Sequence, residues 1–225
     1  MLECRHVFKK FDGKMVVKDC NFSVQEGEMI GLMGESGSGK STLAKLLIGL
    51  EKPSQGQVLL DGQPYSVKKS GVRILLVFQD SLHSVNPHFT VEQVLTEVLP
   101  KDVAREEIEA ILEDVGLDKS YLSQPARQLS GGQLQRICIA RGLLLKPDIL
   151  IFDEALSGLD PIVQGRLLRL LYDLWEKYQL TYLFISHDFK LSYALCHRIL
   201  VMADGEIVDE IKAVSYTHLT LPTKR

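Results

Sequence analysis

The chain has 225 residues, of which 45% are hydrophobic, which is enough to bury the core of one α/β domain with a smaller inserted subdomain. Its 26 basic and 29 acidic residues give a net charge of −3, which argues against a general nucleic-acid-binding protein. The four cysteines lie far apart without a CxxC pair, and no apolar run approaches the roughly 18 residues that cross a bilayer. We therefore expect a cytosolic protein with reduced thiols rather than a disulfide framework, a zinc site or a membrane span.

Strand signals dominate residues 1–78, with one helix that follows a glycine-rich loop. The expected elements are strands at 2–8 and 14–24, a buried strand that ends at Gly34, a helix at 41–50, and strands near 57–60 and 72–78. The first strands, joined by a turn at 11–13, predict an N-terminal antiparallel β subdomain.

Helical patterns replace strand patterns at about 80–130, where a helical subdomain inserted into the core is expected. Its helices are predicted at 91–99 and 105–115, with prolines as boundaries. The elements expected after it are a helix that begins near Gly131, a strand that ends at Asp153, a helix at 161–178, a strand at 180–186 and a pair of strands near 198–210. This alternation predicts an α/β fold whose mostly parallel sheet is covered on both faces.

Residues 1–214 are predicted to form one domain that includes the helical insertion. The segment 215–225, SYTHLTLPTKR, has no helical or strand period. We interpret it as a non-native tail or a disordered terminus, and it does not enter the fold argument.

The segment GESGSGKS matches the phosphate-binding pattern G-x-x-x-x-G-K-[ST] and lies between an expected strand and an expected helix. Glycines let successive backbone amides turn toward phosphate groups, and the start of the helix adds partial positive charge. Lys40 is expected to reach the β- and γ-phosphates, and the Ser41 hydroxyl is expected to ligate Mg²⁺. The predicted phosphate-binding residues are Gly34, Glu35, Ser36, Gly37, Ser38, Gly39, Lys40, Ser41 and Thr42.

A second buried strand, ILIFDE, ends in two carboxylates. Ligands of α/β sheets bind at the carboxyl ends of the strands, so Asp153 is expected to hold Mg²⁺ directly or through water. Glu154, the next residue, is expected to polarise the water that attacks the γ-phosphate.

Two further polar residues follow apolar strands. His187, in FISHD, could donate a hydrogen bond to the γ-phosphate. Gln79, at the end of ILLVF, could contact Mg²⁺ or the attacking water and connect the site to the helical insertion. Either residue alone would signify little, and each gains weight from the phosphate loop.

The segment LSGGQLQR, residues 129–136, opens a helix with two glycines. Each glycine costs about 1 kcal/mol in a helix interior relative to alanine. No residue close by in the sequence explains why two poor helix formers stand at the start of this helix.

The phosphate loop, Gln79, LSGGQ, ILIFDE, SGLD and FISHD occur in this order. Over residues 2–211 the chain resembles the ATP-binding subunits of ABC transporters. This resemblance implies a P-loop NTPase core of the ABC ATPase type, with ATP and Mg²⁺ as cofactors and ATP hydrolysis as the activity.

The resemblance also implies that two ATPase domains meet head to tail, so that the ligand of LSGGQ arrives on another chain. ATP binding would close this dimer, and hydrolysis would reopen it. Phe11 would stack on the adenine ring of the bound nucleotide. The residues implied to contact the partner's nucleotide are Ser130, Gly131, Gly132, Gln133 and Asp160.

The segments VFQDSLHSVNPHFTV and LSGGQLQRICIAR resemble the ATPases of dipeptide, oligopeptide and nickel importers. The implied partners are a second ATPase subunit, two integral-membrane permease subunits and, indirectly, an extracytoplasmic substrate-binding protein, without nucleic acid. A heterodimer with a sister ATPase is favoured over a homodimer. The implied location is the cytoplasmic face of the cell membrane, as a peripheral subunit, with residues 80–100 lining a groove for the permease.

Other functions remain open at this point. An ABC exporter or a lipoprotein-release ATPase would share the same core. A DNA-repair ATPase would need a long coiled-coil insertion, and a translation ATPase usually carries two such domains in one chain. No NKxD-type guanine-reading motif occurs, and the retention of Lys40, Asp153, Glu154 and His187 argues against an inactive binding module.

Overall fold

The computed structural model describes residues 1–78, 85–99, 103–154 and 160–212. Contacts divide the chain into two compact units. The first unit combines Met1–Leu76 with the chain from Asp148 onward, and the second unit is Val77–Pro147. The tail assigned from the sequence to 215–225 lies outside the described residues, as does Gln79.

The N-terminal strands form the expected antiparallel sheet, with the strand order β2-β1-β4-β5. The strands are β1 (Leu2–Phe11), β2 (Lys14–Val24), β4 (Gln55–Leu60) and β5 (Gln63–Pro64). Both hairpins of this sheet turn at an Asp-Gly pair, Asp12-Gly13 and Asp61-Gly62, in which all four residues have positive φ. Such turns match the twist of the strands they join, and Asp-Gly is a preferred sequence for them.

The second sheet has six strands in the order β10-β9-β3-β8-β7-β6. Strand β3 pairs in parallel with β8 and β9, and β7 pairs in parallel with β8, which confirms the predicted mostly parallel sheet. Only β10 is paired antiparallel among the pairings described, with β9. The strands are β3 (Met29–Met33), β6 (Ile74–Phe78), β7 (Ile149–Asp153), β8 (Thr181–Ile185), β9 (Arg198–Ala203) and β10 (Glu206–Lys212).

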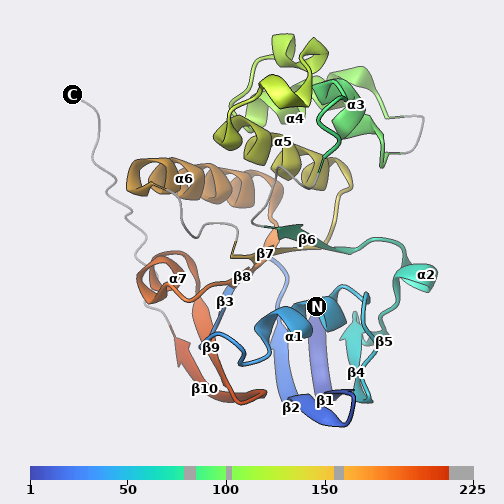
Figure 1. Ribbon diagram of the computed structural model, residues 1–225, viewed down its shortest axis with the longest axis vertical. Helices are drawn as coiled ribbons and strands as arrows, with labels where there is room; N and C mark the ends of the chain where they lie inside the picture. Colours follow the sequence, from blue (N-terminus) through green and yellow to red (C-terminus); the bar gives the residue numbers. More distant parts are fainter. Residues whose placement is uncertain (79–84, 100–102, 155–159, 213–225) are drawn as a thin grey trace. The chain divides into compact units, whose positions relative to one another are not determined.

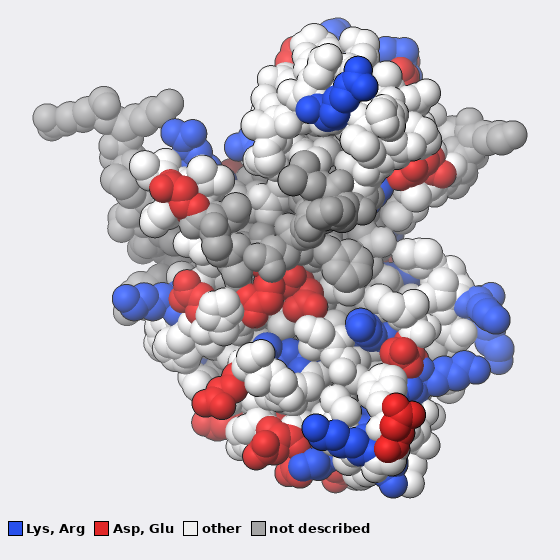
Figure 2. Space-filling view, in the orientation of Figure 1, with Lys and Arg blue, Asp and Glu red and all other residues white. Residues whose placement is uncertain are grey.

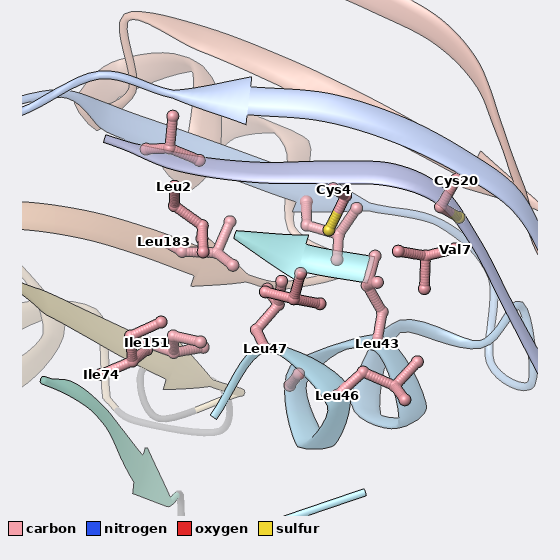
Figure 3. Packing of buried hydrophobic residues seen from close by; sticks show 14 of the residues in the cluster. Leu2, Cys4, Val7, Cys20, Leu43, Leu46, Leu47, Ile74, Ile151 and Leu183 are labelled. Atoms are coloured by element: carbon pink, nitrogen blue, oxygen red, sulfur yellow. The ribbon is translucent and has the colours of Figure 1, made fainter. Parts of the chain in front are cut away.

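Helix α1 (Lys40–Leu47) contacts strands of both sheets, β2 and β7, and its apolar face forms part of the core between them (Figures 1 and 3). Leu43, Leu46 and Leu47 of this helix are almost fully buried. Figure 3 shows Leu43 and Leu47 on the side of the helix toward Cys4 and Val7 of β1. Burial of a leucine side chain stabilises a fold by roughly 1.5–3 kcal/mol, so this packing anchors the start of α1, where the phosphate loop ends.

Helix α6 (Pro161–Tyr178) buries Leu167, Leu171 and Leu174, which are spaced to share one face. Trp175 on the same helix donates its indole N–H to the Gly27 carbonyl oxygen over 2.9 Å. The helix expected at 161–178 is therefore present, and it serves core packing. The first unit also contains α2 (Val67–Ser70) and α7 (Phe189–Leu195), two short helices that were not expected from the sequence pattern.

All four cysteines are buried, and none forms a disulfide. Burial raises the pKa of the Cys20 thiol to about 11 and also raises the pKa of the Cys4 and Cys196 thiols. Each of the four cysteines is therefore a buried thiol in this fold.

The second unit is helical, and α5 contacts both α3 and α4. Its elements are α3 (Val91–Thr96), α4 (Arg105–Asp114), the 3₁₀ helices η1 (Lys119–Ser123) and η2 (Ala126–Gln128), and α5 (Gly131–Leu144). By its contacts, α5 belongs to this second unit. The boundary expected from the sequence, at about 130, would place α5 in the α/β core instead. Helices α3 and α5 each begin with a capping box, Thr90 with Gln93 and Ser130 with Gln133.

Candidate nucleotide-binding site

The phosphate loop connects the buried strand β3 to α1, as its motif requires. Gly37 and Gly39 have φ values of +84° and +108°, in the region that favours glycine. Gly39 is the N-cap of α1, and no side chain caps this helix. The loop therefore exposes backbone amides at a helix start, an arrangement that suits an anion.

Lys40, the first residue of α1, turns its side chain back onto the phosphate loop. Its ammonium group donates to the carbonyl oxygens of Gly34 and Glu35 over 2.7 and 2.8 Å, and the residue is 8% exposed. These two neutral acceptors hold the ammonium group inside the loop. A bound phosphate oxygen can replace them as the acceptor of its hydrogen bonds.

Asp153 ends β7 beside the start of α1, and the Ser41 side chain hydrogen-bonds to its carboxyl group. The Oδ1 atom of Asp153 is buried and has no hydrogen-bond partner. Burial raises the pKa of this carboxyl group, and the Ser41 hydrogen bond and the Lys40 charge oppose that shift. An unpaired buried carboxylate oxygen next to a serine hydroxyl is an oxygen donor set that fits Mg²⁺.

Asp153→Asn is expected to stabilise the protein measured without metal at neutral pH. A raised pKa means that the folded state binds a proton at Asp153 more tightly than the unfolded state does. The stability that this proton contributes is present at low pH and is lost as the pH rises through the raised pKa. Asparagine is neutral throughout, so the melting temperature at pH 8 should rise by about 2 °C. Thermal unfolding between pH 4 and pH 8 checks this. Asp209→Asn on the exposed face of β10 is the control, and a lower melting temperature for Asp153→Asn alone would contradict the burial argument.

Glu154 and His187 contact each other at the ends of β7 and β8. The His187 Nδ1 atom lies 3.1 and 3.0 Å from the two carboxylate oxygens of Glu154. Glu154 has a φ of +53°, and its backbone N–H donates to the Ile185 carbonyl oxygen over 2.9 Å. The two strand ends thus fix the turn that points the carboxylate at the histidine.

These residues share one cavity of about 750 Å³, whose walls come entirely from the first unit. It brings together most of the predicted phosphate-loop residues, both carboxylates and His187. It also includes Val16 of β2, which carries no chemical signal and was not predicted from the sequence. The lining residues are Val16, Ser36, Gly37, Gly39, Lys40, Ser41, Thr42, Asp153, Glu154 and His187.

Phe11 is not among the residues that line this cavity. It ends β1, is 40% exposed, and lies 4.7 Å from the Lys9 ammonium group, measured to the ring centroid. One face of the ring therefore has a cation as its neighbour, and stacking on adenine stays a prediction. Gln79 falls outside the described residues.

The LSGGQ segment lies in the second unit, where Ser130 is the N-cap of α5. The Ser130 hydroxyl accepts from the Gln133 N–H, and the Gln133 side-chain oxygen accepts from the Ser130 N–H over 2.8 Å. The Gln133 side-chain NH₂ group donates to the Tyr121 hydroxyl over 2.9 Å. Gln133 thus has polar partners inside its own unit, where it holds the helix start.

Asp160 of the SGLD segment is the N-cap of α6. Its carboxylate accepts from the backbone N–H groups of Ile162 and Val163 over 2.9 and 3.4 Å. Ile162 is 67% exposed, so this helix start is a solvent-accessible surface of the first unit.

The loop, the cavity and the parallel sheet define a P-loop nucleotide-binding protein. The ABC transporter family matches residues 17–157. The chain is 41% identical over 213 residues to the metal-staphylopine import system ATP-binding protein CntF of Staphylococcus aureus, covering 92% of this chain and 85% of the relative. It is 40% identical over 215 residues to the nickel import ATP-binding protein NikE of Escherichia coli, covering 88% and 80%.

Two solved structures have the same fold. The protein cbiO1 from Clostridium perfringens, part of the ABC transporter complex cbiONQ, gives a TM-score of 0.85 at 28% identity, over 94% of this chain and 88% of that one. The ATP-binding cassette MJ0796, in a dimeric post-hydrolysis state bound to ADP and phosphate, gives 0.78 at 28% identity, over 96% and 100%. The chain belongs to the ABC transporter family and is the nucleotide-binding ATPase subunit of such a transporter.

Proposed function

We propose that this chain powers an importer of nickel or of a metal chelate by hydrolysing ATP. The observation that carries the proposal is the cavity in which Lys40, Ser41, Asp153, Glu154 and His187 meet. The import direction and the metal cargo are supported by the names of CntF and NikE. Peptide import is the related alternative, because the segment VFQDSLHSVNPHFTV resembles the ATPases of dipeptide, oligopeptide and nickel importers alike.

Each residue of the cavity has a separate role in ATP hydrolysis. Backbone amides of the phosphate loop and the Lys40 ammonium group bind the β- and γ-phosphates of ATP. The Glu154 carboxylate accepts a hydrogen bond from the attacking water and takes its proton as the oxygen attacks phosphorus. His187, which contacts that carboxylate, orients it and donates toward the γ-phosphate. The products are ADP and phosphate.

Asp153 and the Ser41 hydroxyl are the residues proposed to hold Mg²⁺. The unpartnered Oδ1 atom of Asp153 and the hydrogen bond between the two side chains support this assignment. When bound, the metal would neutralise charge on the phosphate oxygens. Gln79 stays a proposed further contact of the metal or of the attacking water.

The LSGGQ segment is proposed to contact nucleotide bound to a second ATPase chain. A Cβ atom added at Gly131 or Gly132 would meet nothing within 4 Å, and both residues are exposed. Packing within the described residues therefore does not require glycine at either position. Close approach of a phosphate from outside would require it, which supports a trans role for Ser130, Gly131 and Gly132, with Gln133 holding the helix start and Asp160 at the same interface.

Ser130→Arg is expected to leave ATP binding to the single chain unchanged and to block dimer closure. The matched control is Thr90→Arg, which removes a capping box of the same kind at α3. Each variant should lose about 1 kcal/mol of stability, the usual effect of a lost N-cap. The mass in solution of each variant, measured with ATP-Mg²⁺ and the sister ATPase, distinguishes the two. Thr90→Arg should form the closed dimer, and Ser130→Arg should not. Equal dimerisation of the two variants would contradict the trans assignment.

The partners of the ATPase are membrane permease subunits, which an ABC transporter requires. We further propose a sister ATPase as the dimer partner, an extracytoplasmic substrate-binding protein reached through the permease, and a peripheral location at the cytoplasmic face of the membrane. Among the described residues, no helix combines the length and the hydrophobicity that a membrane span needs. On the face shown in Figure 2, basic and acidic side chains of the described residues are interspersed, which supports the proposal that nucleic acid is not a partner.

Import is tested by co-expressing the chain with the ATPase and permease genes that neighbour it. We expect uptake of radioactive nickel, with or without a chelator, that is lost when Glu154→Gln replaces the wild-type chain. Uptake of a labelled dipeptide instead would favour the peptide alternative. Export from preloaded vesicles without any uptake would overturn the import direction.

A further inference from the structure

The turn between β9 and β10 lies against the phosphate loop, although it is far from the loop in sequence. Its residues are Asp204 and Gly205, with φ values of +49° and +89°. The Gly205 N–H donates to the Ser38 carbonyl oxygen of the phosphate loop over 3.0 Å. This turn carries none of the sequence motifs of the nucleotide site.

The same glycine also joins the turn to β2. The Gly205 carbonyl oxygen accepts from the Lys18 N–H over 2.7 Å and from the Cys20 thiol over 3.4 Å. Three separate segments of the first unit, β2, the phosphate loop and the β9–β10 turn, are therefore tied together by one residue.

Close backbone approach requires glycine where these segments meet. A Cβ atom at Gly205 would lie 2.7 Å from the Val16 carbonyl oxygen, and one at Gly39 would lie 2.8 Å from the same oxygen. A Cβ atom at Gly34 would collide with the Met202 carbonyl oxygen of β9. The phosphate loop thus rests directly on the backbone of β2 and of the β9–β10 hairpin.

The hydrogen bond to Ser38 determines how the next amide is aimed. A trans peptide is planar, so its C=O and N–H point in opposite directions, and no described peptide bond is cis. When the Ser38 carbonyl is held on the Gly205 N–H, the Gly39 N–H must point away from the turn. Gly39 is itself one of the residues that line the nucleotide cavity.

We propose that Gly205 is a positioning residue for nucleotide binding, which fixes the Ser38–Gly39 peptide so that its N–H faces the phosphates. The proposal rests on nucleotide binding at the phosphate loop and adds a residue to that site. Preorganised donors bind an anion more tightly because the loop does not have to be ordered when the ligand arrives.

The test compares Gly205→Ala with Gly62→Ala, which the chain offers as a matched control. Both glycines follow an aspartate in a hairpin turn with positive φ, +89° and +75°, but a Cβ atom at Gly62 would meet nothing within 4 Å. Both variants therefore share the backbone cost, and only Gly205→Ala displaces the support of the loop. We expect the dissociation constant for ATP-Mg²⁺, measured by calorimetry, to rise about tenfold for Gly205→Ala and less than about twofold for Gly62→Ala. The KM for ATP should rise likewise, with kcat little changed.

Amide hydrogen exchange of the wild-type protein tests the inference without a variant that could fail to fold. Saturating ATP-Mg²⁺ should slow exchange of the Gly205 amide about tenfold, because its acceptor Ser38 is then held by the ligand. An unchanged Gly205 amide, or equal nucleotide affinity of the two alanine variants, would overturn the positioning role. If the wild-type protein itself bound no nucleotide, the proposed function would fall as well, so the two failures are distinguishable.

Discussion

Glu154→Gln is expected to bind ATP normally and to hydrolyse it about 10²–10⁴-fold more slowly than the wild-type protein, the usual loss when a general base is removed. Glutamine has nearly the same shape as glutamate, so the turn at the end of β7 should remain intact. The lost property is the ability to take a proton from the attacking water. Single-turnover phosphate release, measured together with nucleotide affinity, separates the chemical step from binding.

A second readout of Glu154→Gln is its mass in solution after removal of the segment beyond Val214. If hydrolysis reopens a closed ATPase dimer, the variant mixed with the sister ATPase should shift to the mass of the dimer when ATP-Mg²⁺ is added, and it should keep that mass. Glu176→Gln, the same chemical change on the exposed face of α6, is the control and should behave as wild type. Normal turnover by Glu154→Gln would remove this residue from the mechanism. A variant that binds ATP but stays monomeric in that mixture would contradict closure of the dimer by ATP.

Lys40→Ala is expected to weaken ATP binding by about 100-fold or more. The wild-type ammonium group is largely buried against the Gly34 and Glu35 carbonyl oxygens and provides a charge-assisted hydrogen bond to phosphate. Such a bond contributes roughly 1.5–3 kcal/mol, and alanine removes both the bond and the local positive charge. Equilibrium binding of ATP-Mg²⁺ and ADP-Mg²⁺ measures the loss.

The control for Lys40→Ala is Lys45→Ala, which removes the same charge from the exposed side of the same helix. Its effect on nucleotide affinity should stay within about twofold, because an exposed charge is screened by solvent. Similar losses in the two variants would show that general electrostatic attraction, and not the phosphate loop, determines the affinity.

The sequence predicted the phosphate loop, the two carboxylates and His187 because each follows a buried strand of a parallel sheet. Strands in such a sheet bring their carboxyl ends to one edge, so residues separated by more than 100 positions become neighbours without any long-range signal in the sequence. The cavity that joins Lys40, Asp153 and His187 has this origin.

Val16 and Gly205 could not be predicted in the same way, because each contributes its backbone and carries no reactive group. Their importance comes from which chain segments approach each other, and this is fixed only when both sheets are assembled. Helix α7 was also missed, although Asp188 caps it and Leu191 and Leu195 share one buried face. Its seven residues are too few for a helical period to stand out.

The ligand of the LSGGQ segment could not be predicted from this chain, for a different reason. Its capping box explains why the helix begins at Ser130, and the structure shows that box. The two exposed glycines after it have no explanation within the described residues, because nothing there approaches them. Sequence and structure therefore agree on the geometry of this segment, and its ligand remains a proposal about another molecule.

The burial of all four cysteines makes this ATPase a convenient protein for site-specific labelling. Thiol reagents attack the exposed thiolate, so the native sulfur atoms should react slowly without being replaced. A single cysteine introduced at an exposed position such as Ile162 would be modified first. Spectroscopic probes attached there could follow the approach of a second subunit during turnover in an otherwise unaltered chain.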